Sequence, residues 1–140
     1  MSIVLGYDES PGARRALGLA VEFAQRFAEP LVLVYGSAPP GLVGEEAVVH
    51  TQALAELGRT ALAHAVADAE AAGVAVKVEL LDEKPVPALL DAAERHDARM
   101  IVVGTYGESP LRGAILGSVS YRLLHLSERP VLCVPPAPEA

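Results

Sequence analysis

The residues best able to do chemistry lie in one glycine-framed segment between residues 104 and 120. Its glycines and hydroxyl residues include Gly104, Thr105, Gly107, Gly117, Ser118 and Ser120. Glycine lets the backbone come close to a ligand, and hydroxyl groups add hydrogen-bond donors. Gly117 and Ser118 precede a helical repeat whose first N–H groups lack intrahelical acceptors, which makes an anion site. Taken singly, Gly104 would be a strand-end turn and Ser118 an N-cap, but the set favours a phosphate-bearing ligand.

Two common phosphate-binding motifs are missing from the sequence. It contains no Gly-Lys-Ser or Gly-Lys-Thr, so it has no Walker-type loop. The first apolar run is followed by Gly6-Tyr7-Asp8-Glu9-Ser10 instead of a G-x-G-x-x-G turn, which removes the usual dinucleotide fingerprint.

Short β-branched runs alternate with alanine-rich helical stretches along the chain. The predicted strands are Ile3 to Tyr7, Leu31 to Tyr35, Val74 to Leu81, Met100 to Val103 and Val131 to Val134. Apolar residues recur at helical spacing in four intervening stretches: Leu17 to Ala28, Leu54 to Ala65, Val86 to Ala93 and Val119 to Leu126. Gly73 and Pro130 mark the ends of the second and fourth helices. The third strand alternates in polarity, which is typical of an edge strand.

This alternation predicts a single α/β domain over residues 1–140, an open parallel sheet with helices on both faces. Ligands of such sheets bind outside the carboxyl ends of the strands, so the ends of the first and fourth strands would share one crevice if these strands are neighbours. The stretch 38–44, rich in proline and glycine, fits a mobile flap or a plain surface loop. Residues 136–140 are predicted to be a frayed tail.

Composition narrows the class of partner. Of 140 residues, 51% are hydrophobic and 21% charged, which is typical of a globular protein. Lys and Arg total 11 against 18 Asp and Glu, and the formal charge of -7 argues against nucleic acid as a partner. No apolar stretch is long enough for a membrane span and no export signal is evident. One cysteine fits a reducing compartment, so we predict a cytoplasmic protein.

The spacing Gly104-x2-Gly107-x9-Gly117-Ser118 resembles the glycine signature of the universal stress protein family, in its ATP-binding branch. The opening Ile3-Val4-Leu5-Gly6-Tyr7-Asp8-Glu9-Ser10 resembles that family's first strand and its Asp. The ending Arg129-Pro130-Val131-Leu132-Cys133-Val134 resembles its closing strand.

The resemblance implies a Rossmann-like, adenine nucleotide alpha hydrolase-like fold with five parallel strands in the order 3-2-1-4-5. It implies ATP, with or without Mg²⁺, in the crevice. It also implies a homodimer whose closing strands, within residues 130–134, pair across the interface. The function implied is a nucleotide-dependent regulatory module of the stress response.

The resemblance also assigns positions around the nucleotide. They are Tyr7, Asp8, Gly36, Val103, Gly104, Thr105, Tyr106, Gly107, Arg112, Gly117, Ser118, Val119 and Ser120. Tyr7 and Asp8 would border the adenosine half, Gly36 the base, and Val103 and Gly104 the ribose. Gly107 and residues 117–120 would hold the phosphates, with Thr105 and Tyr106 in the turn between them and a cation from Arg112.

Two residues depart from the family pattern. Gly36 offers no side chain to the base, so affinity would be lower unless Tyr35 compensates. Glu108 follows Gly107 where a basic residue is common, and it would repel phosphates if it points inward and no divalent ion intervenes. These departures leave open a second hypothesis, a dimeric interaction protein with an idle nucleotide site.

No catalytic residue is predicted. No metal-site spacing occurs among His50, His64, His96 and His125. Cys133 lies in an apolar run, where we expect a small residue of the core. Asp8 is the one carboxylate placed beside the nucleotide, where it is a candidate to hold Mg²⁺ or orient a water. We therefore expect binding without catalysis, with a slow Mg²⁺-dependent ATPase as the remaining alternative.

Overall fold

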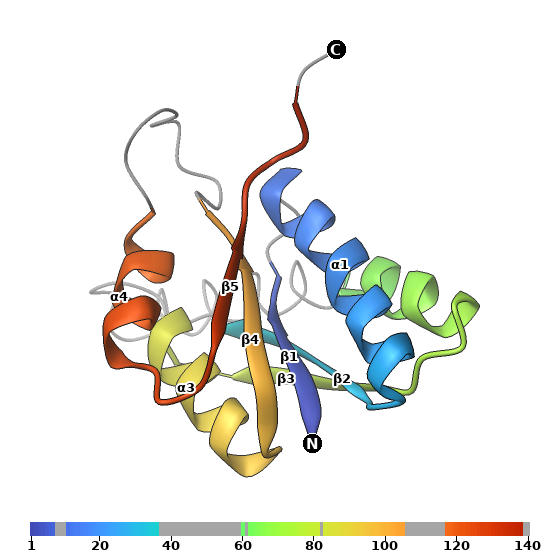
Figure 1. The fold of residues 1–140 in the computed structure, drawn as a ribbon, viewed down its shortest axis with the longest axis horizontal. Coiled ribbons are helices and arrows are strands. Elements are labelled where there is room, and N and C mark those ends of the chain that lie inside the picture. Colours follow the sequence, from blue (N-terminus) through green and yellow to red (C-terminus); the bar gives the residue numbers. More distant parts are fainter. Residues whose placement is uncertain (8–10, 37–59, 61, 82, 106–116, 139–140) are drawn as a thin grey trace, which may run out of the picture.

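Strands and helices alternate along the chain, as the apolar patterns predicted (Figure 1). The computed structural model describes residues 1–140 except 8–10, 37–59, 61, 82, 106–116 and 139–140. Its elements are β1 (Ser2–Gly6), α1 (Pro11–Phe27), β2 (Leu31–Gly36), a helix over 62–71, β3 (Val76–Leu81), α3 (Pro85–Arg95), β4 (Ala98–Gly104), α4 (Ser118–Leu126) and β5 (Val131–Val134). The stretch 38–44 and the predicted helical positions before residue 60 lie outside the described residues.

The strands form one parallel sheet in the order β3-β2-β1-β4-β5. β1 is central, and its Leu5 pairs with Leu33 of β2 on one side and Val102 of β4 on the other. The chain moves outward from β1 to β3 and then returns to the other side of β1 for β4 and β5. The predicted strand order is confirmed, and the first and fourth strands are neighbours.

Helices cover both faces of the sheet, also as predicted (Figure 1). One apolar core lies beneath α1 and the helix over 62–71, and it includes Leu5, Ala20 and Leu62. The other lies beneath α3 and α4, and it includes Val4 and Leu89. Val4 and Leu5 enter different cores because successive strand residues point to opposite faces. Burial on both faces explains the nearly continuous apolar runs in the sequence.

The ends of several elements differ slightly from the predicted ones. α1 ends at Phe27, because Ala28 adopts the left-handed conformation with a φ of 55°. Gly73 ends the preceding helix as predicted, with a φ of 78° that glycine adopts at little cost. β3 begins at Val76 because the Val74 amide donates to the carbonyl of Ala69 in the helix before it.

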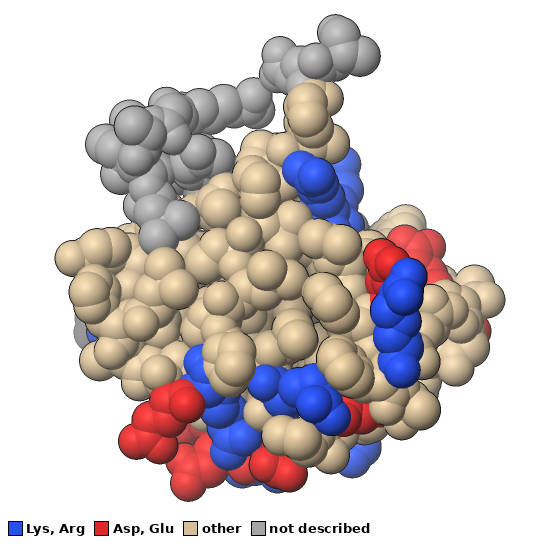
Figure 2. Space-filling model, viewed as in Figure 1, with Lys and Arg blue, Asp and Glu red and all other residues tan. Residues whose placement is uncertain are grey.

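Charged side chains gather at the end of the molecule where the strands begin (Figure 2). Ion pairs at this end join Arg99 to Glu29 at 2.5 Å and Arg129 to Asp97 at 3.3 Å. The face over β5 and α4 is largely uncharged in the same view. No helix in the described part of the chain is long and apolar enough to cross a membrane.

Candidate functional site

The candidate site lies at the carboxyl ends of β1 and β4, where the strand order reverses. Chain segments leaving the two strands turn toward opposite faces at such a point, and the crevice between them is where open parallel sheets bind ligands. The described residues around it come from the ends of β1, β4 and β5 and the first turns of α1 and α4.

Gly104, the last residue of β4, lies directly against the first turn of α1. A Cβ added to Gly104 would lie 2.9 Å from the carbonyl carbon of Gly12 and 3.0 Å from the amide nitrogen of Ala13. Both are backbone atoms, which cannot move aside as the end of a side chain can. Glycine at this position therefore sets how closely β4 approaches α1.

Two backbone hydrogen bonds hold the residues that flank positions 106–116. The amide of Gly117 donates to the carbonyl of Thr105 at 2.7 Å. The amide of Thr105 in turn donates to the carbonyl of Val134 at the end of β5, at 3.1 Å. The end of β4, the residue before α4 and the end of β5 are thus tied together.

Within the described residues, no side chain caps the first turn of α4, and this turn carries no acidic residue. Gly117 is the N-cap of this helix. The N–H groups of residues 118–120 have no acceptor within the helix, and the helix dipole adds partial positive charge there. Ser118 is exposed beside these amides. This arrangement suits a phosphate or another anion.

The two serines of this turn differ sharply in their surroundings. Ser120 is only 1% exposed, and its hydroxyl donates to the carbonyl of Gly104 at 2.7 Å. Ser118 is exposed to solvent. Of the two hydroxyls expected to face the phosphates, the structure leaves only that of Ser118 on the surface.

Thr105 contributes a buried hydroxyl oxygen that has no hydrogen-bond partner within the described part of the chain. Buried polar groups are nearly always paired, so such an atom calls for a partner. That partner comes from residues outside the described ones, from an ordered water or from a bound ligand. A ligand with hydrogen-bonding groups at the end of β4 therefore fits this structure.

The described positions expected around the adenosine half lie directly after β1, at the end of β2 and on β4. Tyr7 is 6% exposed, and its amide donates to the carbonyl of Val34 at 3.2 Å. Gly36 is the last residue of β2. Val103 is 4% exposed and packs in the core beneath α3 and α4, so it offers a ligand its backbone only.

Several predicted site residues lie outside the described residues. They are Asp8, Tyr106, Gly107 and Arg112, together with the departure at Glu108. Their expected roles stay predictions. The structure brings together Gly104, Thr105 and Gly117 to Ser120, and it places Tyr7 and Gly36 at the ends of the two adjoining strands.

The sequence interpretation missed the part that α1 plays beside the site. Its second residue, Gly12, provides the flat backbone against which Gly104 lies. One turn on, the guanidinium of Arg15 donates to the carbonyls of Pro135 and Pro136, both at 3.2 Å, and holds the start of the C-terminal tail. A glycine in the first turn of α1 was the signal that could have indicated a close approach there.

Two of the histidines considered for catalysis make other contacts, and His50 lies outside the described residues. The ring of His96 lies 2.6 Å from a carboxylate oxygen of Glu79, and His125 packs edge-on against Tyr121. Cys133 is half-buried, and burial raises the pKa of its thiol, partly offset by a hydrogen bond with Ser120. Within the described ranges, no three His, Cys, Asp or Glu residues form a group that could hold a metal ion.

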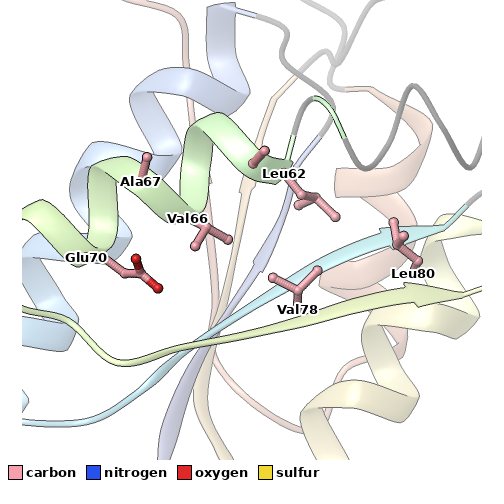
Figure 3. Close-up of a pocket in the computed structure, with 7 residues that line it drawn as sticks. Leu62, Val66, Ala67, Glu70, Val78 and Leu80 are labelled. Atoms are coloured by element: carbon pink, nitrogen blue, oxygen red, sulfur yellow. The ribbon is translucent and has the colours of Figure 1, made fainter.

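An apolar groove of about 380 Å³ lies elsewhere, between the helix over 62–71 and the edge strand β3 (Figure 3). Leu62, Val66, Val78 and Leu80 line it, and Glu70 supplies the one charge. A carboxylate in an apolar groove disfavours a phosphate-bearing ligand. This groove is therefore a poorer candidate for an anion than the start of α4.

Comparisons with known proteins agree with this geometry. Residues 1–135 match the profile described as the Universal stress protein family. Universal stress protein MJ0531 of Methanocaldococcus jannaschii is 31% identical over 136 residues, which cover 94% of this chain and 80% of that protein. The chain spans about half the length of several longer relatives.

Two solved structures are informative about ligands. The universal stress protein from Archaeoglobus fulgidus in complex with dAMP has a TM-score of 0.72 and 26% identity, with 96% of this chain and 97% of that one covered. A universal stress protein in complex with cAMP has a TM-score of 0.70 and 27% identity, with 98% of each chain covered.

Proposed function

The chain belongs to the universal stress protein family, and we propose that it binds an adenine nucleotide at the carboxyl ends of β1 and β4. The observation that carries the proposal is the first turn of α4, which has no side-chain cap and no acidic residue. The Gly117 amide before it donates to the Thr105 carbonyl at 2.7 Å, which holds this turn at the end of β4. The phosphates would accept hydrogen bonds from the amides of residues 118–120 and from the exposed Ser118 hydroxyl.

The related structures with dAMP and cAMP support the class of ligand. Both ligands combine adenine, a sugar and one phosphate, so an adenine nucleotide is the chemistry they share. ATP is our specific proposal, because the glycine-framed segment up to α4 offers more donors than one phosphate needs. Asp8 and Arg112, which would meet Mg²⁺ and the outer phosphates, lie outside the described residues.

We further propose that the protein acts as a regulatory module and not as an enzyme. A ligand can switch a protein only if it binds two conformations with different affinity. A bound nucleotide would exert that preference at the end of β4 and the start of α4, where the Gly117 amide donates to the Thr105 carbonyl.

A matched pair of variants at Ser118 tests the site. Ser118→Asp and Ser118→Asn are nearly equal in size, and an Asp at the first residue of a helix is favoured by the helix dipole, so both should fold. The Asp carboxylate would lie where the phosphates sit. We expect calorimetry to show ATP affinity lowered at least about tenfold in Ser118→Asp relative to Ser118→Asn, with adenosine binding equal in both. Equal ATP affinity of the two variants would show that the phosphates do not bind at the first turn of α4.

We also propose that the protein forms a homodimer through β5. β5 is an edge strand, and the carbonyls of Pro130 and Val134 point toward β4, where they accept hydrogen bonds from Ile101 and Thr105. Alternation then directs the backbone groups of Val131 and Cys133 to the open edge. The largely uncharged face over β5 and α4 suits burial against a second copy (Figure 2).

A further inference from the structure

The side chain of Ser120 is buried and already paired, unlike a side chain that meets a ligand. It is 1% exposed, and its hydroxyl donates to the Gly104 carbonyl at 2.7 Å. Ser118 and Ser120 are two residues apart on α4, which rotates them about 200° relative to each other. One serine therefore faces outward and the other faces the sheet, as their exposures show.

The hydrogen bond of Ser120 joins α4 to the end of β4, the two elements that form the proposed site. Gly104 cannot shift toward α1, because Gly12 and Ala13 already lie against it. The Ser120 side chain also lies close to the thiol of Cys133 on β5. The first turn of α4 is thus tied to β4 by one buried side chain, while the Gly117 amide ties the same turn to Thr105.

We propose that Ser120 is a positioning residue, whose hydroxyl fixes the amides of α4 relative to the end of β4 and does not touch the phosphates. This inference rests on the proposed nucleotide site, and it separates the roles of two serines that the sequence treats alike. Loss of the hydroxyl would leave the Gly104 carbonyl without its partner and let the first turn of α4 move away from β4.

The test compares Ser120→Ala and Ser120→Thr with a control at the other end of the same helix. The Ser127 hydroxyl donates to the Arg129 carbonyl at 2.8 Å, so Ser127→Ala removes a serine-to-backbone bond remote from the site. Amide exchange by NMR on the ligand-free variants reports how firmly the first turn of α4 is held against β4. Calorimetry with ATP and with adenosine reports the ligand.

In ligand-free Ser120→Ala, we expect faster exchange at the Gly117 and Thr105 amides. We expect its ATP affinity to fall about tenfold while its adenosine affinity is unchanged. Ser120→Thr keeps the hydroxyl and should restore both readouts, and Ser127→Ala should alter neither. A merely structural role would weaken ATP and adenosine equally, because it would act through the folded fraction.

Three results would overturn the proposal. Unchanged ligand-free amides with weaker ATP binding would make Ser120 a direct phosphate contact. Equal losses for ATP and adenosine would make it structural only, and no loss would leave it without a role. If the wild type binds no adenine nucleotide, the proposed function fails, and the ligand-free amides still decide whether the hydroxyl holds α4 against β4.

Discussion

At the scale of single residues, partners and exposure assign roles that residue type alone does not. Glu79 illustrates this on β3, remote from the site. Its carboxylate accepts two hydrogen bonds from Arg95 at 2.5 and 2.7 Å, and the ring of His96 lies 2.6 Å away. The hydrogen bonds from Arg95 are the main reason that the pKa of Glu79 falls to about 2. Glu79 thus fastens an edge strand to the end of α3.

Replacing Glu79 with Gln should destabilise the protein by about 1–2 kcal/mol at pH 7, because a charged hydrogen-bond acceptor is lost. The loss is no larger because the Arg95 side chain is half-exposed and solvent weakens the ion pair. The carboxyl holds its proton more weakly in the folded chain than in the unfolded chain, where its pKa is about 4.3. Its contribution is therefore complete above about pH 5 and is lost as the pH falls through the folded value of about 2.

Urea denaturation of the wild type and Glu79→Gln at pH 7 and pH 3 measures this difference. The control is Glu22→Gln, which removes an exposed pair with Arg26 and should cost at most about 0.5 kcal/mol. A gap between wild type and Glu79→Gln that stays constant from pH 7 to pH 3 would contradict the assigned pKa.

At the scale of elements, the site depends on how closely β4 meets α1. Gly104 has no room for a Cβ because the backbone of Gly12 and Ala13 occupies that space. Gly18, on the exposed side of α1, has nothing within 4 Å of its Cβ position. The same substitution should therefore act in opposite directions at these two glycines.

Gly104→Ala should lower the free energy of unfolding by about 1–3 kcal/mol, the usual cost of overpacking, and weaken ATP binding because the end of β4 must shift. Gly18→Ala should raise stability by up to about 1 kcal/mol, since alanine favours a helix interior. Thermal denaturation and calorimetry measure both effects. A Gly104→Ala protein with native stability and ATP affinity would show that β4 and α1 do not constrain the site.

Local pattern was enough to predict the strands and the helices that the structure describes. The alternation of short apolar runs with helical stretches indicated the parallel sheet, and Gly73 indicated a helix end. The pattern did not show which strands are neighbours, and the order came from the resemblance to a family. The bond between Ser120 and Gly104 spans 16 residues and that from Arg15 to Pro135 spans 120. Such contacts depend on packing across the sheet, which residue spacing does not encode.

At the scale of the whole molecule, the two sheet edges differ. β3 carries the exposed Val78, and β5 ends in the hydrogen bond from Thr105 to Val134. Assembly through β5 would therefore place a second copy next to the residues that frame the proposed nucleotide site. The largely uncharged face over β5 and α4 in Figure 2 makes this edge the better candidate for self-association.

Val131→Pro should shift the protein from dimer to monomer in analytical ultracentrifugation. Proline removes a backbone N–H that points to the open edge and leaves the bonds of Pro130 and Val134 with β4 intact. The control is Val78→Pro, which removes an outward N–H from the opposite edge. The Ala75 carbonyl faces β2, and backbone groups alternate in direction along a strand, so those of Val78 point away from β2. Dissociation by Val78→Pro alone would assign the interface to β3.

The location of the nucleotide is tested most directly by titrating the ligand-free protein with ATP and following backbone amides by NMR. We predict the largest shifts at Ser118, Val119, Ser120 and Thr105, and little change at Val66 and Val78 in the groove beside β3. Shifts confined to that groove, or no shifts at millimolar ATP, would contradict this prediction.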